Sequence, residues 1–159
     1  MRVSIVYGTL SGNAETCAEK VGARLENEGF EVKVDNISDL DVEHFQNQSI
    51  LLLSISTYGE GDPPDDAWEM WDAIVEGGGH DFSNLTFAVL ALGDTDYDLF
   101  CEAGKRFDEA FEKQGGTRLI PRVDCNVDFE EPADQWIESV TAALKEHVKK
   151  LETAEVTAS

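Results

Sequence analysis

Three short, nearly continuous apolar segments limit the folds that are open to this chain. They are VSIVY at 3–7, ILLLSI at 50–55 and TFAVLAL at 86–92. Strands buried on both faces of a parallel sheet have this composition, because neither side of the strand meets water. Two further segments are read as strands: EVKVD at 31–35 alternates like a less buried strand, and RLIPRVD at 118–124 contains a proline typical of an edge strand or bulge. The sequence therefore predicts five strands.

Helical periodicity occupies the intervals between these strands. Apolar residues recur at spacings of three and four in four segments: 14–25, 67–75, 100–111 and 136–151. Glycines follow the first three segments, and Pro132 fits the first turn of the fourth. Strands that alternate with helices predict a right-handed, doubly wound α/β fold, in which one five-stranded parallel sheet carries helices on both faces.

The length of the chain, 159 residues, suits one domain. We expect residues 1–151 to form that domain and residues 152–159, ETAEVTAS, to form a flexible tail. No apolar stretch approaches the roughly 20 residues that span a bilayer, and no signal-peptide pattern follows Met1. A cytoplasmic protein is therefore expected.

Acidic residues dominate the charge of the chain. There are 33 aspartates and glutamates against 12 lysines and arginines, a formal net charge of −21. Such a surface repels nucleic acids and anionic membranes and attracts a basic partner surface. Solubility or life at high salt accounts for the same composition, and the charge alone does not separate these readings.

Three loops are expected to meet at one edge of the sheet. In a doubly wound sheet the ligand crevice lies beyond the carboxyl ends of the strands, where the strand order reverses. This rule selects residues 8–15, 56–64 and 93–99, which follow the three apolar strands. All three loops are rich in small, hydroxyl or acidic residues, so the sequence predicts a ligand site there.

The first loop, YGTLSGNAET at 7–16, is suited to a phosphate although it contains no cation. The unpaired amide N–H groups at a helix start carry partial positive charge and bind anions. The side chains of Thr9, Ser11 and Asn13 add polar groups to them. The alternative is an ordinary helix start at which Ser11 or Asn13 is the N-cap.

Two other nucleotide-binding motifs are excluded because each lacks a required residue. A P-loop needs a lysine after its second glycine, and none follows Gly12. The dinucleotide pattern G-x-G-x-x-G fails after Gly59 and Gly61, because Pro64 occupies the third glycine position. The three cysteines are odd in number and widely spaced, so neither a disulfide framework nor a zinc site is indicated.

The other two loops each place one tyrosine among small and acidic residues. Tyr58 lies in the second loop and Tyr97 in the third. Two aromatic faces on either side of a crevice can enclose a flat, conjugated ring. A phosphate site beside a planar slot describes a mononucleotide with a large ring system.

Together these segments resemble the flavodoxin-like FMN-binding domains. YGTLSGNAET is similar to the family's phosphate loop, T-x-[ST]-G-N-[TA]-E. TYGEGDPPDDA and LGDTDYDLFCEAGKRFD are similar to segments of the FMN modules of diflavin reductases, of which cytochrome P450 reductase and the sulfite reductase flavoprotein are examples. The resemblance implies the strand order 2-1-3-4-5 and one bound FMN.

The resemblance also implies which residues hold the FMN. The first loop would bind the phosphate, Tyr58 and Tyr97 would stack on the isoalloxazine ring, and the carbonyl of Gly59 would lie near flavin N5. The complete implied set is Thr9, Leu10, Ser11, Gly12, Asn13, Ala14, Thr57, Tyr58, Gly59, Glu60, Gly61, Leu92, Gly93, Asp94, Tyr97, Phe100 and Cys101. No catalytic residue and no metal ligand are expected.

The function that the resemblance implies is electron transfer. The protein would use the semiquinone and hydroquinone forms of FMN to carry electrons from a flavodoxin- or ferredoxin-type reductase to an acceptor enzyme, and its acidic surface would dock both. Because the FAD and NADPH domains of diflavin reductases have no counterpart in these 159 residues, a free-standing, monomeric carrier is expected. The alternatives are an FMN-dependent oxidoreductase such as a quinone reductase, and a partner-binding module without FMN.

Overall fold

The apolar segments form the centre of one parallel sheet in the computed structural model, which describes residues 1–9 and 11–158 and the side chains through residue 154. β1 (Arg2–Gly8), β3 (Ile50–Ser56) and β4 (Thr86–Leu92) lie side by side, and β2 (Glu31–Asn36) lies beside β1. The order β2-β1-β3-β4-β5 and the parallel pairing confirm the predicted fold class.

The last strand differs from its expected form. β5 (Thr117–Arg118) and β6 (Val123–Cys125) both pair with β4, in place of one strand over 118–124. Pro121 lies between them, and a proline has no N–H to donate to a ladder. The edge of the sheet is therefore built from two short strands with an unpaired segment between them.

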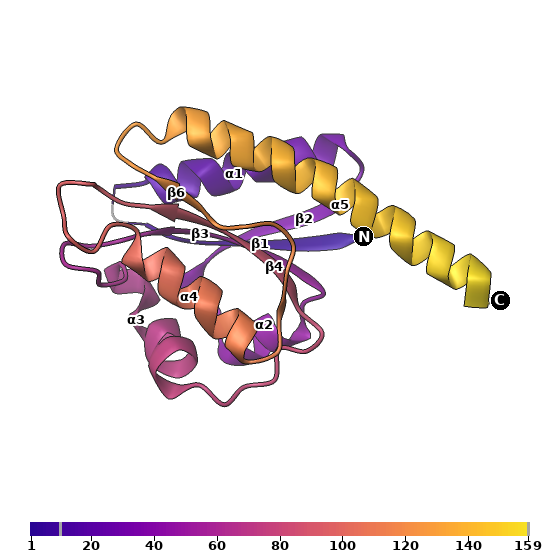
Figure 1. The fold of residues 1–159 in the computed structure, drawn as a ribbon, viewed down its shortest axis with the longest axis horizontal. Helices are drawn as coiled ribbons and strands as arrows, with labels where there is room; N and C mark the ends of the chain where they lie inside the picture. The colour runs from indigo at the N-terminus through magenta and orange to yellow at the C-terminus, as the bar shows by residue number, and fades with distance from the viewer. Residues whose placement is uncertain (10, 159) are drawn as a thin grey trace.

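Helices cover both faces of the sheet (Figure 1). α1 (Asn13–Asn27) and α5 (Glu130–Ala158) pack on one face. The other face is covered by η1 (Ile37–Asp39), α2 (Val42–Asn47), an irregular helical segment over 65–77, and α4 (Glu102–Lys113). η1 and α2 were not predicted from the sequence.

The two apolar cores alternate along each central strand. In β3, Ile50 and Leu52 face the core under α1 and α5, whereas Leu51 and Leu53 face the opposite core. All four side chains are fully buried. This alternation with both sides apolar explains why the strands appear as continuous hydrophobic runs.

The helix expected over 67–75 is irregular. A 3₁₀ turn, η2 (Asp65–Ala67), leads into α3 (Trp68–Met70), and a π-helical segment, η3 (Trp71–Gly77), ends at Gly78 with φ 66°. At the other end of the chain, α5 continues past residue 151 and projects away from the sheet (Figure 1). Residues 152–158, expected as a tail, continue this helix, and they contain no glycine or proline that would end it.

Gly104 marks the closest approach of α4 to the sheet. A Cβ atom built at this position would overlap the Cβ of Ala91 in β4. Gly104→Ala is therefore expected to lower the free energy of unfolding by about 1–3 kcal/mol, although alanine favours a helix. Urea denaturation measures this loss. Glu109→Ala, at an exposed position of the same helix, is expected to change stability by less than about 0.5 kcal/mol, and equal losses would contradict the packing argument.

Candidate functional site

The loops at the carboxyl ends of the strands enclose a small cavity of about 190 Å³. It lies beyond β1, β3, β4 and β6, where the strand order reverses. Seven of the positions selected from the sequence line it: Ser11, Asn13, Ser56, Thr57, Leu92, Gly93 and Asp94. The cavity lies at the edge of the sheet that the crevice rule selects, and the assignment of these residues to a ligand stays a prediction.

The start of α1 has no side-chain cap. Its N-cap residue is Gly12, with φ 90°, and no side chain in the described part of the chain bonds the first amides of the helix. Thr9 Oγ1 instead accepts the N–H of Gly12 at 2.9 Å, while Ser11 and Asn13 are exposed. The alternative of a helix capped by Ser11 or Asn13 is therefore wrong. The open amides at this helix start suit an anion.

The second loop forms a tight turn that presents Tyr58. The N–H of Tyr58 donates to the carbonyl of Asp62 at 2.7 Å, and Gly59 and Gly61 have φ values of 45° and 101°. Tyr58 is 58% exposed, so a face of its ring is free to stack. A Cβ atom on Gly61 would lie 2.9 Å from Leu99 Cδ1, which shows that the second loop packs against the third.

The third loop turns around Asp94. Asp94 accepts the N–H of Asp96 with its side chain and the N–H of Tyr97 with its carbonyl oxygen. Tyr97 is 49% exposed. Thr57, in the second loop, bonds the segments on both sides of the third loop. Its N–H donates to the carbonyl of Leu92 at the end of β4, and its hydroxyl accepts the N–H of Ala103 in α4.

The remaining predicted residues differ in exposure. Ala14 is fully buried, Phe100 is partly buried and Glu60 is exposed. Cys101 is buried and points toward the carbonyls of Ala91 and Cys125 rather than lining the cavity. Burial raises the pKa of the Cys101 thiol to about 12, so it stays protonated at neutral pH. Leu10 lies outside the described residues.

Three residues that line the cavity were not predicted. They are Asn126, Val127 and Phe129, which follow β6. The crevice rule applies equally to the carboxyl end of the fifth strand, and extending it to that strand selects these three residues.

A larger hollow, of about 1020 Å³, lies away from these loops. It runs between residues 75–80 and α4, and its charged side chains, among them Glu76, Lys105 and Arg106, are of both signs. It does not lie at the strand carboxyl ends. Within the described residues, no group of three or more His, Cys, Asp or Glu side chains is arranged to hold a metal ion.

The chain matches known sequences over most of its length. The family model described as flavodoxin matches residues 5–136. The sulfite reductase [NADPH] flavoprotein alpha-component of Bacillus subtilis (strain 168) is 42% identical over 144 residues, which are 91% of this chain and 24% of that protein. The chain thus spans about a quarter of the length of the curated relatives it matches.

Solved structures agree with the sequence matches. A flavodoxin of Streptococcus pneumoniae TIGR4 superimposes with a TM-score of 0.79 at 27% identity, covering 94% of this chain and 99% of that one. A short-chain flavodoxin associated with a non-canonical PDU bacterial microcompartment gives a TM-score of 0.76 at 29% identity and covers 90% and 99% of the two chains.

Proposed function

The chain belongs to the flavodoxin family, and from this premise we propose that it binds one FMN and carries electrons between redox proteins. The observation that carries the proposal is the uncapped start of α1 beside the cavity. A helix start whose first amides have no side-chain cap can bind an anion without a cation. The phosphate of FMN is such an anion.

The residues around the cavity fit the two ends of FMN. Ser11, Asn13 and the amides at the start of α1 would hold the phosphate. Tyr58 and Tyr97, both about half exposed, would cover the isoalloxazine ring. When bound, the flavin supplies one- and two-electron transfer, and the protein supplies the environment of its ring.

Titration of the flavin-free full chain with FMN tests this proposal. We expect one FMN to bind per chain, and quenching of flavin fluorescence measures this binding. Riboflavin, which lacks the phosphate, is expected to bind at least tenfold more weakly, because the helix-start amides then have no anion to bind. A chain that binds neither ligand would refute the proposal and favour a partner-binding module.

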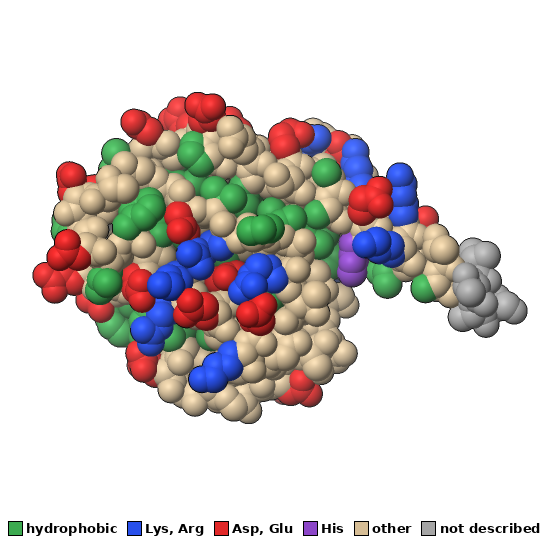
Figure 2. Space-filling view, in the orientation of Figure 1, with side chains coloured by type: hydrophobic (Ala, Val, Ile, Leu, Met, Phe, Trp, Pro, Cys, Tyr) green, Lys and Arg blue, Asp and Glu red, His purple; other side chains and the backbone are tan. Residues whose placement is uncertain are grey.

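We further infer that the acidic surface docks basic partner proteins. Figure 2 shows acidic side chains along the left and upper outline of the molecule, whereas lysine and arginine gather over α4 and on the projecting part of α5. The loops of the candidate site lie at the left end. Tyr58, Tyr97, Leu99 and Val127 are large apolar side chains exposed in these loops. Exposed acidic residues, among them Glu60, Asp96 and Asp128, lie close to them in the sequence.

Reduction kinetics separate a carrier from an enzyme. If the protein is a carrier, NADH or NADPH alone leaves its FMN oxidised, and a separate reductase reduces it at a rate that falls steeply with ionic strength. Steady NADH oxidation without a partner would favour an FMN-dependent oxidoreductase.

Across residues 1–9 and 11–158, no helix has both the length and the apolar composition to cross a bilayer. Three buried free thiols are typical of a reducing compartment, so we place the protein in the cytoplasm.

A further inference from the structure

The loop that carries Tyr97 has few hydrogen bonds to other segments of the described chain. Residues 95–99 are exposed, and the bonds of Asp96 and Tyr97 run back to Asp94 within the loop. Among the described residues, the hydrogen bonds that tie residues 94–98 to another segment are two bonds between Thr95 and Asn126.

These two bonds use both ends of one amide. Asn126 Oδ1 accepts the backbone N–H of Thr95 at 3.0 Å, and Asn126 Nδ2 donates to Thr95 Oγ1 at 2.9 Å. The backbone N–H admits only an acceptor, so the orientation of the amide is determined by its partner. With one bond alone, Thr95 could still rotate about that bond. The two bonds together fix both the position and the orientation of Thr95 relative to Asn126.

Asn126 lies directly after an edge strand of the sheet. It follows Cys125, the last residue of β6, which pairs with Leu92 of β4. The carbonyl of Cys125 also accepts the N–H of Gly93 at 2.9 Å. The anchor of the loop is therefore a strand end that is hydrogen-bonded to the central sheet, and Asn126 lines the cavity beside Asp94.

We propose that Asn126 is a positioning residue, which holds residues 94–98 in the conformation that presents Tyr97 to the flavin. The proposal rests on the proposed function, because the ligand it serves is FMN. Asn126 acts through Thr95 and the loop. It controls how much of the binding free energy is lost in ordering this exposed segment.

Replacement of the amide separates positioning from packing. Asn126→Ala removes both bonds, and Thr95→Val removes the bond to the hydroxyl while keeping the N–H. Asn126→Asp restores the contact, because a carboxylate accepts the N–H and the Thr95 hydroxyl turns to donate to it. Asn84→Ala, at an exposed position outside the site, is the matched control.

Hydrogen exchange measures the loop directly, on the full chain as purified and after removal of flavin. Asn126→Ala is expected to speed exchange of the 94–98 amides roughly tenfold and to weaken FMN binding roughly tenfold, which corresponds to two modest hydrogen bonds. Thr95→Val is expected to fall between this variant and the wild type. Asn126→Asp is expected to restore the slow exchange, and Asn84→Ala to match the wild type.

The proposal is overturned if Asn126→Ala leaves exchange of residues 94–98 unchanged, or if Asn126→Asp exchanges as fast as Asn126→Ala. Thermal unfolding identifies a variant that has lost its fold. If Asn126→Ala does not fold, Thr95→Val takes its place, and unchanged exchange of residues 94–98 in a Thr95→Val variant of native stability would overturn the proposal. If the wild-type chain binds no FMN, the proposed function fails. Exchange in the flavin-free chain still tests the role of Asn126.

Discussion

Replacing Asn13 with aspartate is expected to raise the dissociation constant for FMN about a hundredfold. Asn13 is the first residue of α1, is exposed, and lines the cavity. A carboxylate there would lie close to the phosphate that the open helix start is proposed to bind. Two like charges 4 Å apart repel by about 1 kcal/mol in water and about 4 kcal/mol near a protein surface, which brackets the expected change.

Two controls separate this repulsion from damage to the fold. Riboflavin lacks the phosphate, so Asn13→Asp is expected to leave its dissociation constant nearly unchanged. Asn27 lies at the opposite end of α1 and is exposed; Asn27→Asp adds the same charge and is expected to leave FMN binding intact. Because an acidic residue at a helix start stabilises the helix, the flavin-free Asn13→Asp protein is expected to be no less stable than the wild type. Equal weakening of FMN and riboflavin would contradict a phosphate at this position.

The central sheet was predictable because it is buried on both faces. The apolar runs in β1, β3 and β4 have side chains in both cores, so no choice of register was needed to recognise them. The loops of the site then followed from topology, since parallel strands end at one edge. The loop at 7–16 was recognisable as a candidate phosphate site because its two glycines and polar residues lie within ten consecutive residues.

Features that depend on distant contacts were not predictable. α2 contains only two apolar residues, Val42 and the fully buried Phe45, and a single spacing of three in a six-residue helix does not define a period. The partnership of Asn126 with Thr95 joins residues 31 apart in the chain. Likewise, the composition of Trp71–Gly77 resembles that of an ordinary helix and gives no sign of its π-helical form.

Neutralising Asp108 is expected to cost more stability than any exposed charge on α4. Its side chain is 5% exposed and receives two bonds from Arg118, Nε to Oδ1 at 3.0 Å and Nη2 to Oδ2 at 2.9 Å. Arg122 lies 3.6 Å from the same carboxylate. Asp108→Asn keeps the volume and removes the charge, so both largely buried guanidinium groups lose their shared buried partner and keep only Glu112 and Asp124, respectively. A loss of about 2–4 kcal/mol in the free energy of unfolding is expected.

Glu112→Gln is the matched control, because Glu112 pairs with the same arginine from the same helix. Its bond to Arg118 Nη1 is 2.7 Å long, but its side chain is 59% exposed. Water already solvates that carboxylate, so the expected loss is below about 1 kcal/mol. Urea denaturation of both variants gives the comparison, and equal losses would show that burial does not set the strength of these pairs.

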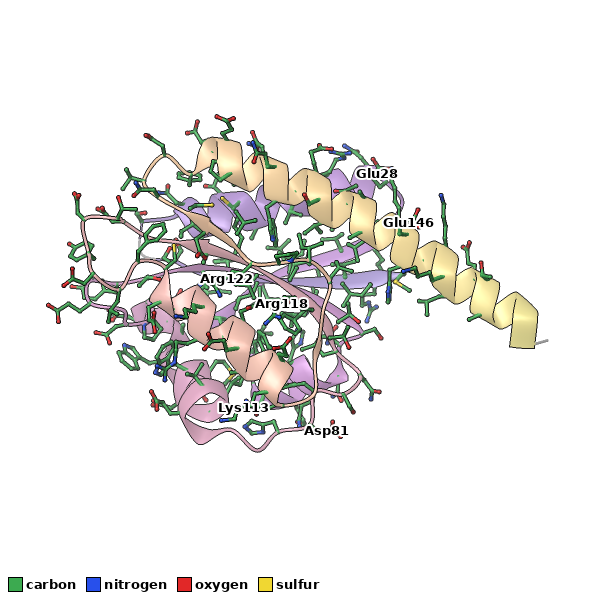
Figure 3. All side chains as sticks on the ribbon, viewed as in Figure 1. Glu28, Asp81, Lys113, Arg118, Arg122 and Glu146 are labelled. Atoms are coloured by element: carbon green, nitrogen blue, oxygen red, sulfur yellow. The ribbon has the colours of Figure 1, made fainter. Side chains whose placement is uncertain are left out.

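The position of the two arginines explains why this carboxylate matters to the sheet. Arg118 ends β5 and Arg122 immediately precedes β6, so they flank the segment around Pro121 that has no strand pairing. Figure 3 shows both labelled side chains beside α4. Asp108 on α4 thus joins the two halves of the interrupted strand where the ladder cannot. Since Asn126 follows β6 and lines the cavity, loss of Asp108 is also expected to destabilise this side of the proposed flavin site. Faster hydrogen exchange in residues 123–126 of Asp108→Asn, but not of Glu112→Gln, would establish that link.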